Sequence, residues 1–321
     1  MNEPTYEMGL RSASALKLRA TRLLAEGGPE AGLEAAILFH DAARAEHRAF
    51  QVLEAPSALA RLRSLVEVGA CYLAGFDPWS AADIWGALLQ LKPLVSADVF
   101  DAQTADFRAR FELESKAVKP LIRGMHPSAL TSPSLTARRT LRQTCARARN
   151  RFPGASNLWW IEYRCAYEAQ DWAKAWTAIS AVCRLDPERE TPLAMRAELV
   201  AHLRTPAALT FADALLARLP DLGPQVALFL SFTLAALDNG DRTRLTQALE
   251  AVRAAAESPR RPPTAEESRY IRAHALMLNA WLEGKAMSLE DALYRTGLGR
   301  QALVNDVELS DLARSELGQA A

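Results

Sequence analysis

Three residues in the stretch 157–187 have the types and the spacing of a partner-binding surface. Trp160, Arg164 and Tyr167 lie at i, i+4 and i+7, so a helix presents them on one face. The two rings can stack on a partner, the guanidinium can pair with a carboxylate, and all three residue types are enriched at binding hot spots. The same spacing assigns the other tryptophans of this stretch to packing between helices: Trp159, Trp172 and Trp176.

A second set of residues has the charge to bind an anion. Nine lysines and arginines, and no acidic residue, lie between Lys116 and Ile161. In the expected helix Ser134–Phe152, four arginines form a stripe on or beside one face: Arg138, Arg139, Arg142 and Arg149. Like charges on one face repel unless something anionic meets them, such as nucleic-acid phosphate, a nucleotide or an acidic partner. The alternative is neutralisation by acidic residues of the preceding helix: Asp98, Asp101, Asp106, Glu112 and Glu114.

Residues suited to metal binding or nucleophilic catalysis are sparse. His40 and His47 share a helix face, but the positions between them where a third ligand would stand hold Ala43 and Arg44. We therefore interpret both histidines as packing or surface residues, and we expect no metal site and no cofactor. The sequence also lacks an HExxH motif, a phosphate-cradling loop and a nucleophile elbow. Four widely spaced cysteines without a CxxC pair indicate reduced, mostly buried thiols: Cys71, Cys145, Cys165 and Cys183.

The composition predicts an all-α protein. The 321 residues are 50% hydrophobic, which is enough for a sizeable core, and the abundant Ala, Leu and Arg favour helices over strands. The formal net charge is zero, so attraction to nucleic acid or to a membrane would have to be local. The N-terminus does not resemble a secretory signal, and the most apolar run, Val226–Leu237, is too short to span a bilayer. We expect a cytoplasmic, bacterial protein that does not bind membranes.

Two segments of the chain share one pattern of spacing. The first pattern consists of Leu65, Val68, Gly69, Tyr72, Ala81, Trp85 and Pro93. The second, at identical spacing, consists of Trp159, Glu162, Tyr163, Ala166, Ala175, Ile179 and Pro187. The pattern resembles the tetratricopeptide repeat, a pair of antiparallel helices ended by a proline. Because the two helices of such a pair approach closely, we expect Gly69 to face Ala81.

The resemblance implies a binding mode as well as a fold. Tetratricopeptide repeats stack into solenoids whose concave groove, lined by the first helix of each pair, binds peptides or partner helices. For the second repeat the implied groove positions are Asn157, Trp160, Arg164, Tyr167 and Glu168. The alternative is that neighbouring helices cover Trp160 and Tyr167.

Further helix pairs follow the second repeat. We expect one pair over Thr191–Arg204 and Pro206–Arg218, and another over Gln225–Leu237 and Arg242–Glu257. The predicted architecture is an all-α, tetratricopeptide-like solenoid interrupted by longer helices. Its expected regions are an N-terminal helical region with one repeat-like pair (1–95), a long-helix insert with the Arg-rich helix (96–155), repeat-like pairs (156–258) and a C-terminal helical cap (263–321).

Two weaker patterns suggest other functions. Arg196 and His202 resemble the loosely spaced Arg–His pair of the helical nucleases called HEPN domains, but with so many arginines chance alone produces such a match. Ser288–Asp306 resembles a helix-turn-helix, but the residues from Thr264 onward carry more acidic than basic side chains, the wrong sign for a DNA reader. We favour packing for the first pattern and a solenoid cap for the second.

These observations favour an adaptor over an enzyme. The leading hypothesis is a non-catalytic scaffold that binds a partner protein around Trp160, Arg164 and Tyr167, with the arginine stripe as a second contact for an acidic partner. It would be a subunit of a larger complex. The alternative is a regulatory or nucleic-acid-associated protein that contacts phosphate through the Arg-rich helix 134–152 or the C-terminal helices.

Overall fold

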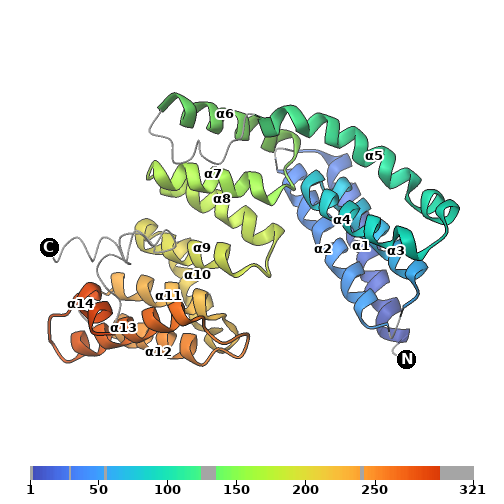
Figure 1. Cartoon of the computed structure of the whole chain (residues 1–321). Helices are drawn as coiled ribbons and strands as arrows, with labels where there is room; N and C mark the ends of the chain where they lie inside the picture. The colour runs from blue at the N-terminus through green and yellow to red at the C-terminus, as the bar shows by residue number, and fades with distance from the viewer. Residues whose placement is uncertain (1–2, 29, 54–55, 124–134, 239–241, 297–321) are drawn as a thin grey trace. The chain divides into compact units, whose positions relative to one another are not determined.

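The computed structural model describes the chain except for residues 1–2, 29, 54–55, 124–134, 239–241 and 297–321. Within that part every regular element is helical, with fourteen α-helices and no strand (Figure 1). The all-α prediction is therefore confirmed. The chain forms two compact units, which we call the N-terminal unit (Met1–Asp171 with Ser180–Asp186) and the C-terminal unit (Trp172–Ile179 with Pro187–Ala321). The division falls inside the predicted region 156–258.

The N-terminal unit begins with two long antiparallel helices, on which the following helices pack. Its helices are α1 (Glu3–Glu26), α2 (Ala31–Gln51), α3 (Ala58–Ala74), α4 (Pro78–Leu91), the 3-10 turn η1 (Lys92–Leu94), α5 (Ala97–Arg123), α6 (Leu135–Arg151) and α7 (Ser156–Glu168). Helix α3 packs against α2, α4 and α5, and α6 packs against α7. The C-terminal half of α8 (Trp172–Leu185) also belongs to this unit. Helix α3 therefore has α5 along one side, which creates the site described below.

The C-terminal unit is a succession of helix pairs. Its helices are α9 (Glu190–Leu203), α10 (Pro206–Leu216), the 3-10 turn η3 (Leu219–Asp221), α11 (Pro224–Ala236), α12 (Thr243–Ala256), α13 (Ala265–Leu282) and α14 (Leu289–Arg295). Helix α11 packs against both α9 and α13, and α12 packs against α11 and α13. Helix α11 thus contacts its partner in the pair, α12, and also α9 and α13, the helices two elements away on either side.

Helix starts recur at a fixed interval. Helices α7, α9 and α11 begin at Ser156, Glu190 and Pro224, successive intervals of 34 residues, and α8 and α10 begin at Trp172 and Pro206, again 34 residues apart. Proline in the first turn of α10 and α11 suits a helix start, because the first turn has no partner for the missing N–H. The helix boundaries predicted for residues 191–257 agree with these starts to within about two residues.

The two repeat-like segments also share their turn geometry. Phe76 and Gln170, which are 94 residues apart, both have left-handed backbones, with φ of 57° and 54°. In both turns the following aspartate donates its backbone N–H to a carbonyl five residues earlier, Asp77 to Tyr72 and Asp171 to Ala166, each at 2.9 Å. Equal spacing in the sequence therefore corresponds to equal local geometry.

The small residue of the first repeat serves a different contact from the one we predicted. A Cβ on Gly69 would lie 2.6 Å from the Phe107 ring of α5 and 3.0 Å from Ile84 of α4. The prediction that Gly69 faces Ala81 of α4 did not include this contact with Phe107 of α5. Gly69 thus brings α5 onto α3.

Candidate functional site

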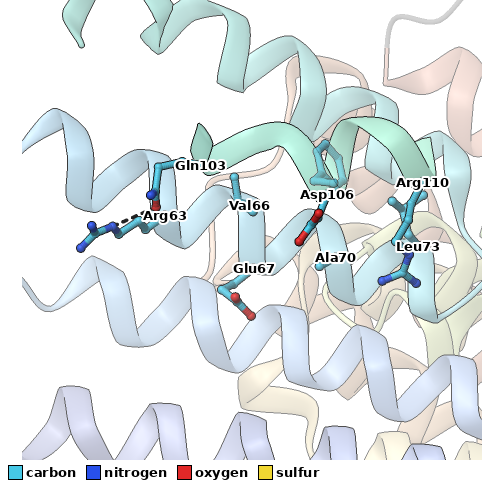
Figure 2. Close-up of a pocket in the computed structure, with 9 residues that line it drawn as sticks. Arg63, Val66, Glu67, Ala70, Leu73, Gln103, Asp106 and Arg110 are labelled. Carbon is cyan, nitrogen blue, oxygen red and sulfur yellow. Dashed lines mark hydrogen bonds between the residues drawn. The ribbon is translucent and has the colours of Figure 1, made fainter. Parts of the chain in front are cut away.

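A groove lies between α3 and α5 in the N-terminal unit (Figure 2). Its volume is about 400 Å³. Helix α3 contributes Arg63, Val66, Glu67, Ala70 and Leu73, and helix α5 contributes Gln103, Asp106, Phe107 and Arg110. Within each helix these residues recur at intervals of three or four, which places them on one face.

The floor of the groove is apolar and its rim is charged. Leu73 and Phe107 are buried, Val66 and Ala70 are half-buried, and the four charged residues of the lining are exposed. Figure 2 shows Arg63 and Gln103 toward one end, Arg110 and Leu73 toward the other, and Glu67 and Asp106 between them. An apolar floor with a few polar groups at its edge is the usual composition of a ligand-binding cleft.

Glu67 is held by a lysine from outside the groove. Lys17 donates hydrogen bonds from Nζ to Glu67 Oε2 and to Glu46 Oε1, both at 3.0 Å. Burial lowers the pKa of Lys17, but the attraction of Cys71, Glu46 and Glu67 outweighs it and leaves the pKa above its ordinary value. The charge of Glu67 is therefore partly offset, by a lysine that it shares with Glu46. At one end of the rim, Arg63 donates to the neutral Gln103, at 3.0 Å.

The groove occupies the positions that the resemblance assigns to partner binding. The predicted positions of the second repeat, moved 94 residues upstream, are Arg63, Val66, Ala70, Leu73 and Ala74. The first four of them line the groove. Sequence reasoning applied the rule to the second repeat alone and so missed this site. The signal that identifies it is the same spacing in the first repeat, together with a following helix that leaves a gap.

The predicted site on α7 is less open than expected. Asn157, Trp160 and Arg164 are half-buried, and Glu168 is exposed. Tyr167, which we expected on the exposed face, is only 9% exposed. It lies at the end of an aromatic row in which Trp160 contacts Tyr163 and Tyr163 contacts Tyr167, with ring centroids 5.3 Å and 5.6 Å apart. The exposed part of this face is therefore Trp160, Arg164 and Glu168, and the last two form an ion pair at 3.7 Å.

The arginine stripe of α6 is partly engaged within the chain. Arg149 pairs with Glu162 of α7 and lies 4.7 Å from the Trp159 ring, and Arg142 donates to the Cys165 carbonyl at 2.8 Å. Among the described side chains, the partners of Arg142 and Arg149 thus come from α7. Arg139 is exposed, and Arg138 lies on α6 with its side chain outside the described residues. Trp159, at 8% exposure, is buried as predicted.

Tryptophans 172 and 176 pack inside the C-terminal unit. Trp172 stacks on His202 with a ring separation of 4.2 Å, and Arg196 lies 4.6 Å from the Trp176 ring and 4.1 Å from the Phe211 ring. The two residues of the nuclease-like pattern, Arg196 and His202, are therefore both in packing contacts with tryptophans. Leu289 and Leu293 of the helix-turn-helix-like segment are buried, whereas its second half, from Gly297 to Asp306, lies outside the described residues.

A buried polar pair joins α2 to the turn before α4. His40 is 4% exposed, and its Nε2 lies 3.5 Å from Oδ2 of Asp77. Asp77 caps α4 by accepting hydrogen bonds from the backbone N–H groups of Trp79 and Ser80. Burial lowers the pKa of His40 to about 4 and raises the pKa of Asp77 to about 6. Because solvent hardly reaches either group, the pair is suited to positioning the turn rather than to acting on a substrate.

All four cysteines are outside disulfide bonds; three are buried and Cys183 is half-buried. Burial raises the pKa of Cys71 to about 11 and that of Cys145 to about 12, so neither is a ready nucleophile at neutral pH.

In comparisons with known proteins, the sequence matches no protein-family profile and no curated protein. Among the described residues, none of the helices has the length and apolarity needed to cross a bilayer.

Proposed function

We propose that this protein is a non-catalytic adaptor that binds a segment of a partner protein in the groove between α3 and α5. The observation that carries the proposal is the match between two independent facts. The groove lies where α3 and α5 leave a gap above an apolar floor, and its α3 residues occupy the positions that a tetratricopeptide-like repeat uses for binding.

We also propose that the helix pairs form a tetratricopeptide-like solenoid. Two observations support it: helix starts that recur every 34 residues, the length of that repeat, and the packing of α11 on both α9 and α13. In such an array the first helices of successive pairs line one face, and α3 and α5 would be the first helices at the groove.

The exposed part of α7 is a second contact in this proposal. Trp160 offers part of an aromatic surface, and the ion pair between Arg164 and Glu168 is a surface pair that a partner can replace at little cost. We propose a protein partner rather than a nucleic acid because Arg142 and Arg149, which could otherwise bind phosphate, already have partners within the chain.

The test fills the groove without touching the core. Ala70 is half-buried on the groove wall, so Ala70→Trp occupies the space over the floor. Ala82, exposed on α4 and outside the groove lining, provides the matched control Ala82→Trp. We expect a partner that co-purifies with the wild-type chain, identified by mass spectrometry, to be retained by Ala82→Trp and lost from Ala70→Trp, with circular dichroism unchanged in both.

A second pair of variants separates the two surfaces. Trp160→Ala combined with Arg164→Ala should weaken the same partner less than Ala70→Trp does. Retention of the partner by Ala70→Trp would refute the groove. Tight binding of a single-stranded DNA oligonucleotide at low salt, unaffected by Ala70→Trp, would instead favour the phosphate-binding alternative.

A further inference from the structure

Resting on that proposed function, we infer that the groove selects partner segments that place an apolar side chain at their centre and a carboxylate toward each end. The inference follows from which charges in the groove are already compensated and from their order along it.

The centre of the groove is suited to an apolar group. Leu73 is 7% exposed and Phe107 is 3% exposed, so their side chains are packed and form a fixed floor rather than a mobile surface. Val66 and Ala70 add half-buried apolar area beside them. Because Gly69 has no side chain, the Phe107 ring packs directly against the backbone of α3, and this close packing fixes the position of the floor.

The two ends of the groove carry uncompensated positive charge. Arg63 donates to the neutral Gln103, and Arg110 is exposed; neither has an ion pair with any residue in the part of the chain that the structure describes. A guanidinium binds a carboxylate with two parallel hydrogen bonds, which makes arginine selective for that group.

The acidic residues lie between these ends and differ from each other. Glu67 is partly offset by Lys17, but Asp106 is exposed and has no ion pair among the described residues. Asp106 therefore repels a carboxylate at the centre of the groove and can accept a backbone N–H or a cation there. The order positive, negative, positive along the groove explains why the acidic groups of the partner belong at its ends (Figure 2).

The helices also set the spacing of those acidic groups. The lining runs from Arg63 to Leu73 on α3 and from Gln103 to Arg110 on α5, which corresponds to roughly 10–15 Å along the groove. That distance is about four residues of an extended segment or about eight of a helix. The spacing between selected acidic residues thus reports the conformation of the bound segment.

The experiment uses the full chain and a phage library of random peptides of about twelve residues. Peptides are selected on the wild-type chain with Ala70→Trp as the counter-selection, so that only groove binders are retained. We expect enrichment of sequences with an apolar residue between two acidic ones. Synthetic copies should bind, by fluorescence anisotropy, roughly tenfold more weakly to Arg63→Glu and to Arg110→Glu, since each change replaces attraction by repulsion. Arg61→Glu, exposed on α3 outside the groove lining, should bind them as the wild type does.

The outcomes distinguish the two proposals. If no peptide prefers the wild type to Ala70→Trp, the groove is not a binding site and the proposed function is overturned. If peptides do prefer the wild type but are neutral or basic at their ends, or are insensitive to Arg63→Glu and Arg110→Glu, the charge selection is overturned while the groove remains. Asp106→Ala should increase tolerance for a central acidic residue, and an unchanged preference would contradict the role of Asp106.

Discussion

The two units stabilise themselves in different ways. In the C-terminal unit, buried residues of α9 to α14 form one continuous apolar cluster, and every residue of α11 from Val226 to Ala235 is buried. In the N-terminal unit the described clusters of buried apolar residues are smaller, and Lys17 forms an ion pair with the buried Glu46 at 3.0 Å.

The difference accounts for where the groove lies. The buried stretch of α11, from Val226 to Ala235, contains two polar residues, but Ser231 donates to the Ala248 carbonyl and Thr233 to the Ala197 carbonyl, so this stretch can be buried on all sides. Helix α3 instead has Arg63 and Glu67 on the face beside α5, and charged side chains are costly to bury. That face therefore stays open to solvent, and an open face with an apolar floor can bind a partner.

The largest effect expected from this comparison concerns core truncation. Leu230 of α11 and Leu88 of α4 are both fully buried. Leu230→Ala should destabilise the C-terminal unit by about 3–5 kcal/mol, and Leu88→Ala should cost less, about 2–3 kcal/mol, because a small cluster near a surface can relax into the space. Hydrogen exchange followed by mass spectrometry, over peptides from α11 and α4, measures each unit separately. Equal losses would show that the division of the core has no energetic consequence.

The next effect concerns the contact that closes α5 onto α3. Gly69→Val puts a side chain where the Phe107 ring lies and should cost about 1–3 kcal/mol in urea unfolding. Gly86→Ala is the matched control, since no atom lies within 4 Å of its added Cβ, and it should stabilise α4 by about 1 kcal/mol. If Gly69→Val left both stability and peptide binding unchanged, the close packing of α5 against Gly69 would not be needed to form the groove.

The response to acid should also differ between the units. Burial lowers the pKa of His274 in the C-terminal unit to about 3, so the unfolded chain binds the proton more readily and the unit loses about 1 kcal/mol per pH unit below pH 6.5. In the N-terminal unit, His40 has a pKa of about 4, so it also lowers the stability of its unit as the pH falls from 6.5 to 4. Asp77 has the opposite effect on stability. Burial raises its pKa to about 6, so protonation below that pH favours the folded state.

The measurement follows hydrogen exchange of α13 and α2 from pH 7 to pH 5, corrected for the intrinsic exchange rate. Protection of α13 should fall more steeply than protection of α2. In His274→Leu the dependence of α13 protection on pH should disappear. In His47→Leu, a variant of an exposed histidine, this dependence should remain. Equal loss of protection in α2 and α13 as the pH falls would contradict the expected difference between the two units.

The smallest effect separates the arginines of α6. Arg149→Ala removes the ion pair with Glu162 and the contact with Trp159, and it should cost about 1 kcal/mol. Arg139→Ala, at an exposed position, should stay within about 0.5 kcal/mol of the wild type in the same urea titration. A larger loss for Arg139 than for Arg149 would mean that the stripe stabilises the protein in a way the structure does not show.

Local spacing predicted much of this molecule. Residue composition and periodicity are sufficient for the all-α class and for most helix boundaries, because helix propensity and the position of proline act over a few residues. The equal spacing around Gly69 and Tyr163 likewise corresponds to two turns of the same backbone geometry. The groove positions on α3 follow from the same pattern, although only the α7 set was derived from it.

Tertiary contacts decided which of those positions are accessible. The spacing places Val66 of α3 and Trp160 of α7 at the same repeat position, but it contains no information about the helix that packs beside each. Only the folded chain shows that Phe107 fits against Gly69 and leaves a groove, that Tyr167 is buried in an aromatic row, and that Glu162 pairs with Arg149. The physical reason is that burial and charge compensation depend on residues far away in sequence, whereas helix formation depends on near neighbours.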